Sequence, residues 1–493
     1  ATETDVTLTA TDTLTNGGTV EAKRNAVLKG TNITNSGTVT AETGNVGVNA
    51  SEKFTNTATG NLTGKTGVAI TANDADVAGT VTAETGKASV IAQNTATITG
   101  AVSGQDVELE GKKGLTINQG ATVTATEGNA TLKGSSIEQN GTVKAKQNAT
   151  LEGGTVTNSG SVTSTEGKVG VNASEKFTNT ATGNLTGKGV SVDAKNIETE
   201  KGSTIKATEK DVTLTASNNL TNGGNVTAAK GDATLKGTTV TNSGSVTATE
   251  GKVGVNASGK FTNTETGNLT GKTGVAITAN DADVAGKVTA ETGAATISAT
   301  NNLSIKEGSQ VSGANVGLKA GENLNIAESA RVTATKGDVN LEGKNITNVG
   351  IVTAKGKIVT KNNGSIEDKK GTIVLENQNA IISNTKDTST LDLIDSFNVI
   401  NREVRPSLRA NEITLHQFGD AKIVNLFNDG RKVTKVSSII SNGSACNTDL
   451  DDSHLLASCI TKNSMHKDQY HEVFSGKVQK GNVDSVGKSL KGR

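Results

Sequence analysis

The sequence predicts an all-β chain that folds as a parallel β-helix, a solenoid of about 18 to 19 coils of roughly 20 residues, with a C-terminal β-rich cap. Three observations support this fold class. A short pattern recurs at a nearly constant spacing, apolar and polar residues alternate within it, and Gly or Asn residues separate the alternating runs. Alternation of period two is typical of a half-buried strand, and a fixed period of 20 to 50 residues is typical of a solenoid.

The repeat is clearest in the run Asp211-Val-Thr-Leu-Thr-Ala216, and equivalent runs open new units from residue 5 to about residue 380. Dividing the 374 residues between the first and last start by eighteen intervals gives a period near 20.8. The units start at Asp5, Asn25, Asn45, Gly67, Lys87, Asp106, Asn129, Asn148, Lys168, Gly189, Asp211, Asp232, Lys252, Gly274, Ala294, Asn315, Asp338, Lys357 and Asn379.

Composition supports an ordered repeat and excludes several function classes. Aromatic residues make up only 2% of the chain, Trp is absent, and there are 58 Gly and one Pro. The 49 basic residues balance the 49 acidic ones, which argues against a nucleic-acid partner because such proteins carry a basic face. No apolar run is long enough to span a membrane. Since the first residues are already in phase with the repeat, we expect an export signal to lie upstream of Ala1.

The first unit shows how one coil is built. Six apolar side chains are predicted to point inward: Val6, Leu8, Ala10, Leu14, Val20 and Ala22. Thr7 and Thr9 fall on the opposite, outward face. The segment Asn16-Gly17-Gly18 is predicted to be a turn. A leucine-rich repeat is excluded because its Leu-x-x-Leu-x-Leu pattern is absent, and a long coiled coil is excluded because Gly, Thr and Asn are poor helix formers.

A longer period is superimposed on the short one. The segment 46–65 is identical to 169–188, and 66–79 is identical to 273–286, an offset of 207 residues that corresponds to a duplicated block of ten units. Phe54, Phe177 and Phe261 recur at the position that Leu14 holds in the first unit, so we expect them to fill the core.

Asn-x-Ser/Thr sequons are abundant, either by chance in an Asn- and Thr-rich chain or as glycosylation acceptors. They begin at Asn32, Asn49, Asn61, Asn129, Asn140, Asn148, Asn172, Asn184, Asn219, Asn225, Asn256, Asn268, Asn302, Asn345, Asn363 and Asn442. Asn49 and Asn172 each lie between two inward positions, so both should point outward.

The sequence offers no catalytic, cofactor or metal site. The acid pairs Asp74/Asp76 and Asp281/Asp283 lack the Gly-Gly-x-Gly-x-Asp repeat of a calcium β-roll, and we interpret them as solvated charge. Residues 1–385 contain no His and no Cys, which leaves an enzyme few general bases there. We therefore expect no enzymatic activity.

Composition changes at about residue 386, which divides the chain into a repeat rod (1–385), a cap (386–461) and a polar tail (462–493). In the cap, strands are expected at 412–417, 421–427 and 433–440, with a hairpin turn at 428–430. Cys446 and Cys459 fit one disulfide, the alternative being two free thiols. All four His also lie in this part, but their spacing gives a zinc site little support.

The repeat resembles the filamentous-haemagglutinin-like exoproteins of two-partner secretion. The resemblance rests on Thr-Asn-Ser-Gly-x-Val turns at residues 34–39, 157–162 and 241–246, and the repeat covers about three quarters of the chain. The segments 408–415 and 439–446, with Cys459, are similar to the C-terminal region of the high-molecular-weight adhesin and EtpA-like subgroup.

This resemblance implies a right-handed parallel β-helix on a secreted or bacterial cell-surface virulence protein. It also implies export through an outer-membrane β-barrel transporter and adhesion to host-cell surface glycans or proteins, or to bacterial surface appendages. In the subgroup, a cytoplasmic glycosyltransferase modifies Asn-x-Ser/Thr, and a C-terminal disulfide like Cys446–Cys459 can hold the protein at the pore. Some thirty residues follow Cys459 here, which departs from that pattern.

Two readings of function follow. The first is a non-enzymatic adhesin rod. The second is a contact-dependent inhibition stick with a C-terminal toxin domain, against which stands the absence of a Val-Glu-Asn-Asn junction and of catalytic spacing.

Overall fold

The computed structural model describes residues 4–356 in full, and beyond them only the strands between 358 and 448. The described residues contain no helix, and their strands form stacked coils of a parallel β-solenoid with about 17 turns of about 21 residues. The predicted fold class is therefore confirmed. The chain divides into two units, residues 1–240 with 244–251, and residues 241–243 with 252–493.

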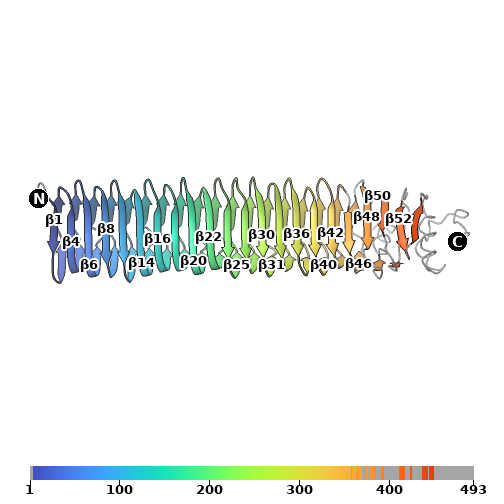
Figure 1. Cartoon of the computed structure of the whole chain (residues 1–493), viewed down its shortest axis with the longest axis horizontal. Helices are drawn as coiled ribbons and strands as arrows, with labels where there is room; N and C mark the ends of the chain where they lie inside the picture. Colours follow the sequence, from blue (N-terminus) through green and yellow to red (C-terminus); the bar gives the residue numbers. More distant parts are fainter. Residues whose placement is uncertain are drawn as a thin grey trace, which may run out of the picture. The chain divides into compact units, whose positions relative to one another are not determined.

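A coil contains three strand positions, and in several coils the first two merge into one long bent strand. Within each unit, consecutive coils lie side by side in sequence order (Figure 1). The strands of the first unit are β1 (Val6–Thr9), β2 (Thr13–Asn16), β3 (Thr19–Ala22), β4 (Ala26–Asn35), β5 (Thr38–Ala41), β6 (Asn45–Asn56), β7 (Asn61–Gly64), β8 (Gly67–Ala72), β9 (Asp74–Val77), β10 (Thr80–Ala83), β11 (Lys87–Ala92), β12 (Thr95–Ile98), β13 (Ala101–Gly104), β14 (Asp106–Ile117), β15 (Thr122–Ala125), β16 (Ala130–Gln139), β17 (Thr142–Ala145), β18 (Ala149–Asn158), β19 (Ser161–Ser164), β20 (Lys168–Asn179), β21 (Asn184–Gly187), β22 (Gly189–Thr199), β23 (Thr204–Ala207), β24 (Val212–Ala216), β25 (Asn219–Asn222), β26 (Asn225–Ala228), β27 (Ala233–Gly237) and β29 (Ser245–Ala248).

The second unit also contains three-strand coils, and residues of β28 (Thr239–Asn242) are divided between the two units. Its strands are β30 (Lys252–Ala257), β31 (Lys260–Asn263), β32 (Asn268–Gly271), β33 (Gly274–Ala279), β34 (Asp281–Val284), β35 (Lys287–Ala290), β36 (Ala294–Ala299), β37 (Leu303–Ile305), β38 (Gln310–Gly313), β39 (Val316–Ala320), β40 (Asn323–Ile326), β41 (Arg331–Ala334), β42 (Val339–Gly343), β43 (Asn345–Asn348), β44 (Ile351–Ala354), β45 (Ile358–Asn362), β46 (Ser365–Asp368), β47 (Ile373–Leu375), β48 (Gln378–Asn384), β49 (Thr390–Asp392), β50 (Ala410–His416), β51 (Lys422–Val424), β52 (Val436–Ser441) and β53 (Ser444–Thr448).

The core is a set of columns, because equivalent inward residues pair in register from coil to coil. Leu8 pairs with Leu28, which pairs with Val48. Leu28 and Val48 are buried, whereas Leu8, which has a neighbouring coil on one side only, is 37% exposed. Each coil thus completes its burial only against coils on both sides, as expected for a solenoid stabilised by nearest neighbours.

The three predicted core phenylalanines are confirmed as fully buried. Phe54 pairs with Ala75 on the next coil, and Phe261 pairs with Ala282. On the next coil, these two phenylalanines therefore meet a small side chain, whereas Phe177 meets the larger Ile197.

The predicted turn at residues 16–18 is wrong in one respect. Asn16 is the last residue of β2, and its side chain points inward and is buried. Asn-Gly is a strong turn signal, but Asn16 has the same parity as the inward Leu14, and the strand continues through it.

The predicted hairpin turn at residues 428–430 lies outside the described residues. Strand β51 pairs in parallel with β49, and the antiparallel pair is β52 with β53. Cys459, Asn363, Asn442 and the tail 462–493 lie outside the described residues, so the disulfide stays a prediction. No helix in the described part of the chain is long and apolar enough to cross a membrane.

Candidate functional site

The most unusual chemistry inside the solenoid is a column of buried asparagines at the last inward position of the second strands. The Nδ2 group of Asn16 donates to Oδ1 of Asn35 at 2.8 Å, and Nδ2 of Asn35 donates to Oδ1 of Asn56 at 2.8 Å. The same bond joins Asn158 to Asn179 in the first unit and Asn242 to Asn263 in the second, both at 2.8 Å. We call this column the asparagine ladder.

The ladder also satisfies backbone carbonyls of the following corner. Asn56 donates to the carbonyl oxygen of Gly60 at 3.1 Å, and Asn179 donates to that of Gly183 at 3.2 Å. A Cβ at Gly60 would overlap Oδ1 of Asn56 and the carbonyl oxygen of Asn35. These corners therefore require glycine for lack of space.

One rung of the ladder is incomplete. Gln139 precedes Asn158 in the column, and its Nε2 group donates instead to the carbonyl oxygens of Gly141 at 2.8 Å and Ser161 at 3.3 Å. The Oδ1 atom of Asn158 is consequently buried without a hydrogen-bond partner. A buried unsatisfied acceptor costs about 1 to 3 kcal/mol.

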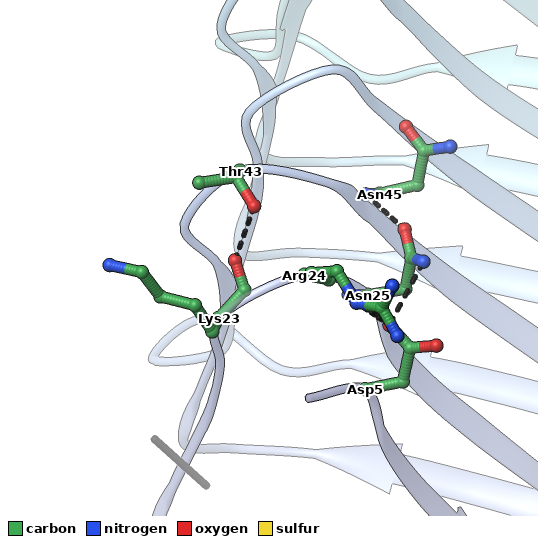
Figure 2. Close-up of polar contacts among 6 residues, drawn as sticks. All are labelled: Asp5, Lys23, Arg24, Asn25, Thr43 and Asn45. Carbon is green, nitrogen blue, oxygen red and sulfur yellow. Dashed lines mark hydrogen bonds and ion pairs between the residues drawn. The ribbon is translucent and has the colours of Figure 1, made fainter. Parts of the chain in front are cut away.

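A second, exposed ladder lies at the corner where each coil begins (Figure 2). Oδ1 of Asp5 accepts from the backbone N–H of Asn25 at 2.9 Å, and Oδ1 of Asn25 accepts from the backbone N–H of Asn45 at 2.9 Å. The N–H of Asn25 is the largest of the influences that lower the pKa of Asp5, to which the nearby Arg24 guanidinium also contributes. At the same edge, the Thr43 hydroxyl donates to the carbonyl oxygen of Lys23 at 2.5 Å.

A third ladder consists of ion pairs at the corner after the third strand. In many neighbouring coils this corner carries lysine on one coil and glutamate on the next, although Gln105 interrupts the series. The pairs are Lys23–Glu42 at 2.7 Å, Lys65–Glu84 at 2.7 Å, Glu127–Lys146 at 2.6 Å, Lys188–Glu209 at 3.3 Å and Lys272–Glu291 at 2.7 Å. Each pair is largely solvated, so its contribution to stability is small. Their shared effect is to leave this edge with little unpaired charge.

The paired acids are engaged by protein groups. Asp76 forms an ion pair with Lys53 at 2.7 Å, and Asp74 accepts from the hydroxyl of Thr95 at 2.7 Å. Hydrogen bonds to Thr95 lower the pKa of Asp74 despite its slight burial. In the second unit, Asp283 lies between Lys260 at 2.7 Å and Lys306 at 3.1 Å. No group of three metal-ligating side chains occurs in the part of the chain that the structure describes.

None of the fourteen sequon asparagines within residues 4–356 is buried. Asn49 and Asn172 point outward from β6 and β20, as predicted, and are exposed. Other sequons use their side chains in cross-coil bonds: Nδ2 of Asn302 donates to Oδ1 of Asp281 at 3.0 Å, and Nδ2 of Asn345 donates to Oδ1 of Asn323 at 3.0 Å. The structure thus separates open sequons from engaged ones.

The surface also carries a shallow depression of about 290 Å³ on the sheet of first strands. It lies over Gly47, Ala69 and Ser89, whose small side chains leave the space, and Lys87 lies at its border. The depression contains no carboxylate, His or Cys, so it presents no general base.

The three ladders were not predicted, although sequence signals for them exist. The inward parity of Asn16, Asn35 and Asn56 places them in one column, and Lys23, Glu42, Lys65 and Glu84 occupy one corner position in four consecutive coils. In comparisons with known proteins, no family model, no curated protein and no solved structure matches this chain.

Proposed function

We propose that this chain is the adhesive rod of a secreted or surface-attached bacterial exoprotein, which attaches its cell to host or bacterial surface ligands through repeated outward faces. The observation that carries this proposal is the uniformity of the coil. Segments 45–56 and 168–179 repeat the same burial pattern residue by residue, and they differ only at their first, outward residue, which is Asn45 in one and Lys168 in the other. A fold of this kind lengthens by adding coils and presents the same chemistry many times.

Multivalency makes such a surface adhesive even when each contact is weak. Binding of several coils at once raises the overall affinity well above that of one coil. Under this proposal, export uses an outer-membrane β-barrel transporter, as the resemblance to two-partner secretion implies. We expect the chain to need no cofactor and to have no enzymatic role.

Attachment of coated beads tests the proposal. Beads that carry the full chain should adhere to cultured epithelial cells or to bacterial cells, and albumin-coated beads should not. The matched variant lacks residues 66–272, one duplicated block of 207 residues, so that Lys65 joins Thr273 in the native sequence context of Lys272. At equal bead loading, this variant should adhere at least about tenfold less, because it has ten fewer coils to engage.

Two results would argue against the adhesin proposal. One is adhesion no greater than that of albumin beads. The other is growth arrest of bacteria that express the full chain, relieved by a neighbouring small protein, which would favour the toxin-bearing alternative.

Glycosylation by a cytoplasmic glycosyltransferase is a separate part of the proposal. Protein from the native host should show hexose-sized mass increments, and peptide mapping should place them on Asn49 and Asn172 more often than on Asn302 and Asn345. The physical reason is that the amide nitrogens of Asn302 and Asn345 already donate to neighbouring coils. An unmodified intact mass would contradict it.

A further inference from the structure

The outward face of the third strands differs from every other face of the first unit in coils two to six. It is formed by alternate residues of β5, β7, β10, β13 and β15. The ten outward residues are Thr38, Thr40, Asn61, Thr63, Thr80, Thr82, Ala101, Ser103, Thr122 and Thr124. None is charged, although charged residues make up 20% of the chain, and none is aromatic or a large aliphatic residue. We call this set the threonine face.

The threonine face is a regular two-dimensional array. Its strands pair in parallel without a register shift, from Thr38 opposite Asn61 to Ala101 opposite Thr122. The sheet of first and second strands does contain shifts, for example between Gly30 and Asn32. Rows on the threonine face are therefore about 4.8 Å apart across strands, and columns are about 6.6 Å apart along them.

The side chains beneath and within the face fix its hydroxyls. The inward neighbours Val39, Leu62, Val81, Val102 and Val123 are at most 1% exposed, so the strands rest on a packed core. Threonine has a restricted χ1 angle, which holds its hydroxyl and methyl groups in defined directions. The hydroxyls of Thr38, Thr40, Thr80, Thr122 and Thr124 have no protein partner among the described residues, so they are available to a ligand.

The chemistry of the face decides what it fits. A protein partner would be anchored by Trp, Tyr or Arg, which are absent here. A nucleic acid would need cations, and a small ligand would need a concave site, whereas the depression described above lies on the other sheet. A regular array of weak hydroxyl and methyl contacts gains affinity only on a surface with matching repeats.

We propose that the threonine face binds the surface of ice. Hexagonal ice has a short in-plane repeat close to the spacing between strands, and its surface offers hydrogen-bonding groups of one kind at regular intervals. Threonine hydroxyls then join the lattice, and the methyl groups between them fill the spaces of the first water layer. This inference stands apart from the adhesin proposal, because it uses a different readout and no cellular ligand.

The test measures thermal hysteresis of single ice crystals, and inhibition of ice recrystallisation, with the purified full chain. Thr80→Lys, at the centre of the threonine face, should lower both activities at least about fivefold, because one long cation breaks the array. The matched control is Thr71→Lys, an exposed outward residue of β8 in the same coil. It should leave both activities unchanged, and circular dichroism should give the same melting temperature for all three proteins.

Absence of hysteresis and of recrystallisation inhibition in the native chain would overturn the proposal. Equal activity of the native chain and Thr80→Lys would also overturn it, as would an equal loss in Thr71→Lys.

Discussion

Two adjacent coils of the first unit carry a polar side chain and an apolar side chain at the same inward position. At the last inward position of the second strand, β6 carries Asn56 and β9 carries Val77, and the two residues pair across the coils. The asparagine rungs fix each coil to the next by directed hydrogen bonds, whereas Val77, Ile98 and Ile117 pack without direction. A polar column fixes the register of adjacent coils, but each asparagine needs the asparagine of the neighbouring coil to satisfy its hydrogen bonds. An apolar column tolerates the loss of one member better.

The largest expected effect comes from the glycine corner that the asparagine rungs occupy. Gly60→Ala should destabilise the protein by about 3 kcal/mol, because the new Cβ would overlap Asn56 Oδ1 and the Asn35 carbonyl. Gly18→Ala is the control, since its Cβ would meet no atom within 4 Å. Urea denaturation gives both values, and equal midpoints for the two variants would contradict the packing argument.

Because each asparagine depends on its neighbours in the ladder, the stability costs of single substitutions are not expected to add up. Asn35→Val should cost about 2 kcal/mol, because it leaves the amides of Asn16 and Asn56 without their ladder partner. The triple variant Asn16→Val, Asn35→Val and Asn56→Val should cost less than three times that value, since it removes both partners of each ladder bond. Chemical denaturation of all the variants tests this, and strict additivity would rule out coupling along the ladder.

The incomplete rung offers a stabilising change. Gln139→Asn should raise the free energy of unfolding by about 1 kcal/mol, because a shorter amide can donate to the unsatisfied Oδ1 of Asn158. The control is Gln147→Asn, an exposed glutamine near the following corner. A melting temperature that falls for the first variant and not for the second would show that the rung cannot re-form.

The smallest effect is expected in the coils whose inner column is Val77, Ile98 and Ile117. In these coils, side-chain polar contacts such as those of Glu108 lie on the outer surface. Glu108 on β14 forms ion pairs with Lys87 and with Lys133, the latter at 3.5 Å. The hydrogen bond from Lys87 is the main reason that the pKa of Glu108 lies below its ordinary value of 4.5. At a pH near the pKa of Glu108, the folded state therefore binds fewer protons at this carboxyl than the unfolded state does.

The pairing of Glu108 accordingly stabilises the protein at neutral pH, and this contribution is lost as the pH falls below about 4.5 through the lowered pKa. Glu108→Gln should cost less than about 1 kcal/mol at pH 7 and nothing below the folded-state pKa. Thermal melting at pH 7 and at acid pH measures the difference. An equal cost at both pH values would assign the loss to packing.

Much of the fold follows from local alternation. The inward positions of Leu14, Val20 and Ala22 and the burial of the three phenylalanines could be predicted, because strand parity fixes which face a residue joins. The ladders could not be predicted from one coil alone. The segment Asn16-Gly17-Gly18 has the composition of a turn. Only the hydrogen bond from Asn16 to Asn35 on the next coil makes an inward position of Asn16 favourable.

In the C-terminal part, the predicted strands 412–417, 421–427 and 433–440 overlap β50, β51 and β52. Their pairing was harder to predict, because β51 pairs in parallel with β49, and a local sequence signal does not reveal which distant strand a segment will join. Candidate surface sites were equally hidden, because the outward threonines are also good strand formers, and their regular spacing emerges only from the register.

The corner bonds in Figure 2 all run in one direction along the chain. The backbone N–H of Asn45 donates back to Asn25, and the N–H of Asn25 donates back to Asp5. Each coil therefore carries an acceptor that only its successor can fill, and it needs no residue further along to close its own bonds to the coil before it. This polarity belongs to the corner, since the asparagine ladder donates in the opposite direction, from Asn16 to Asn35. At the corner, every finished coil can therefore act as the template for the coil that follows it.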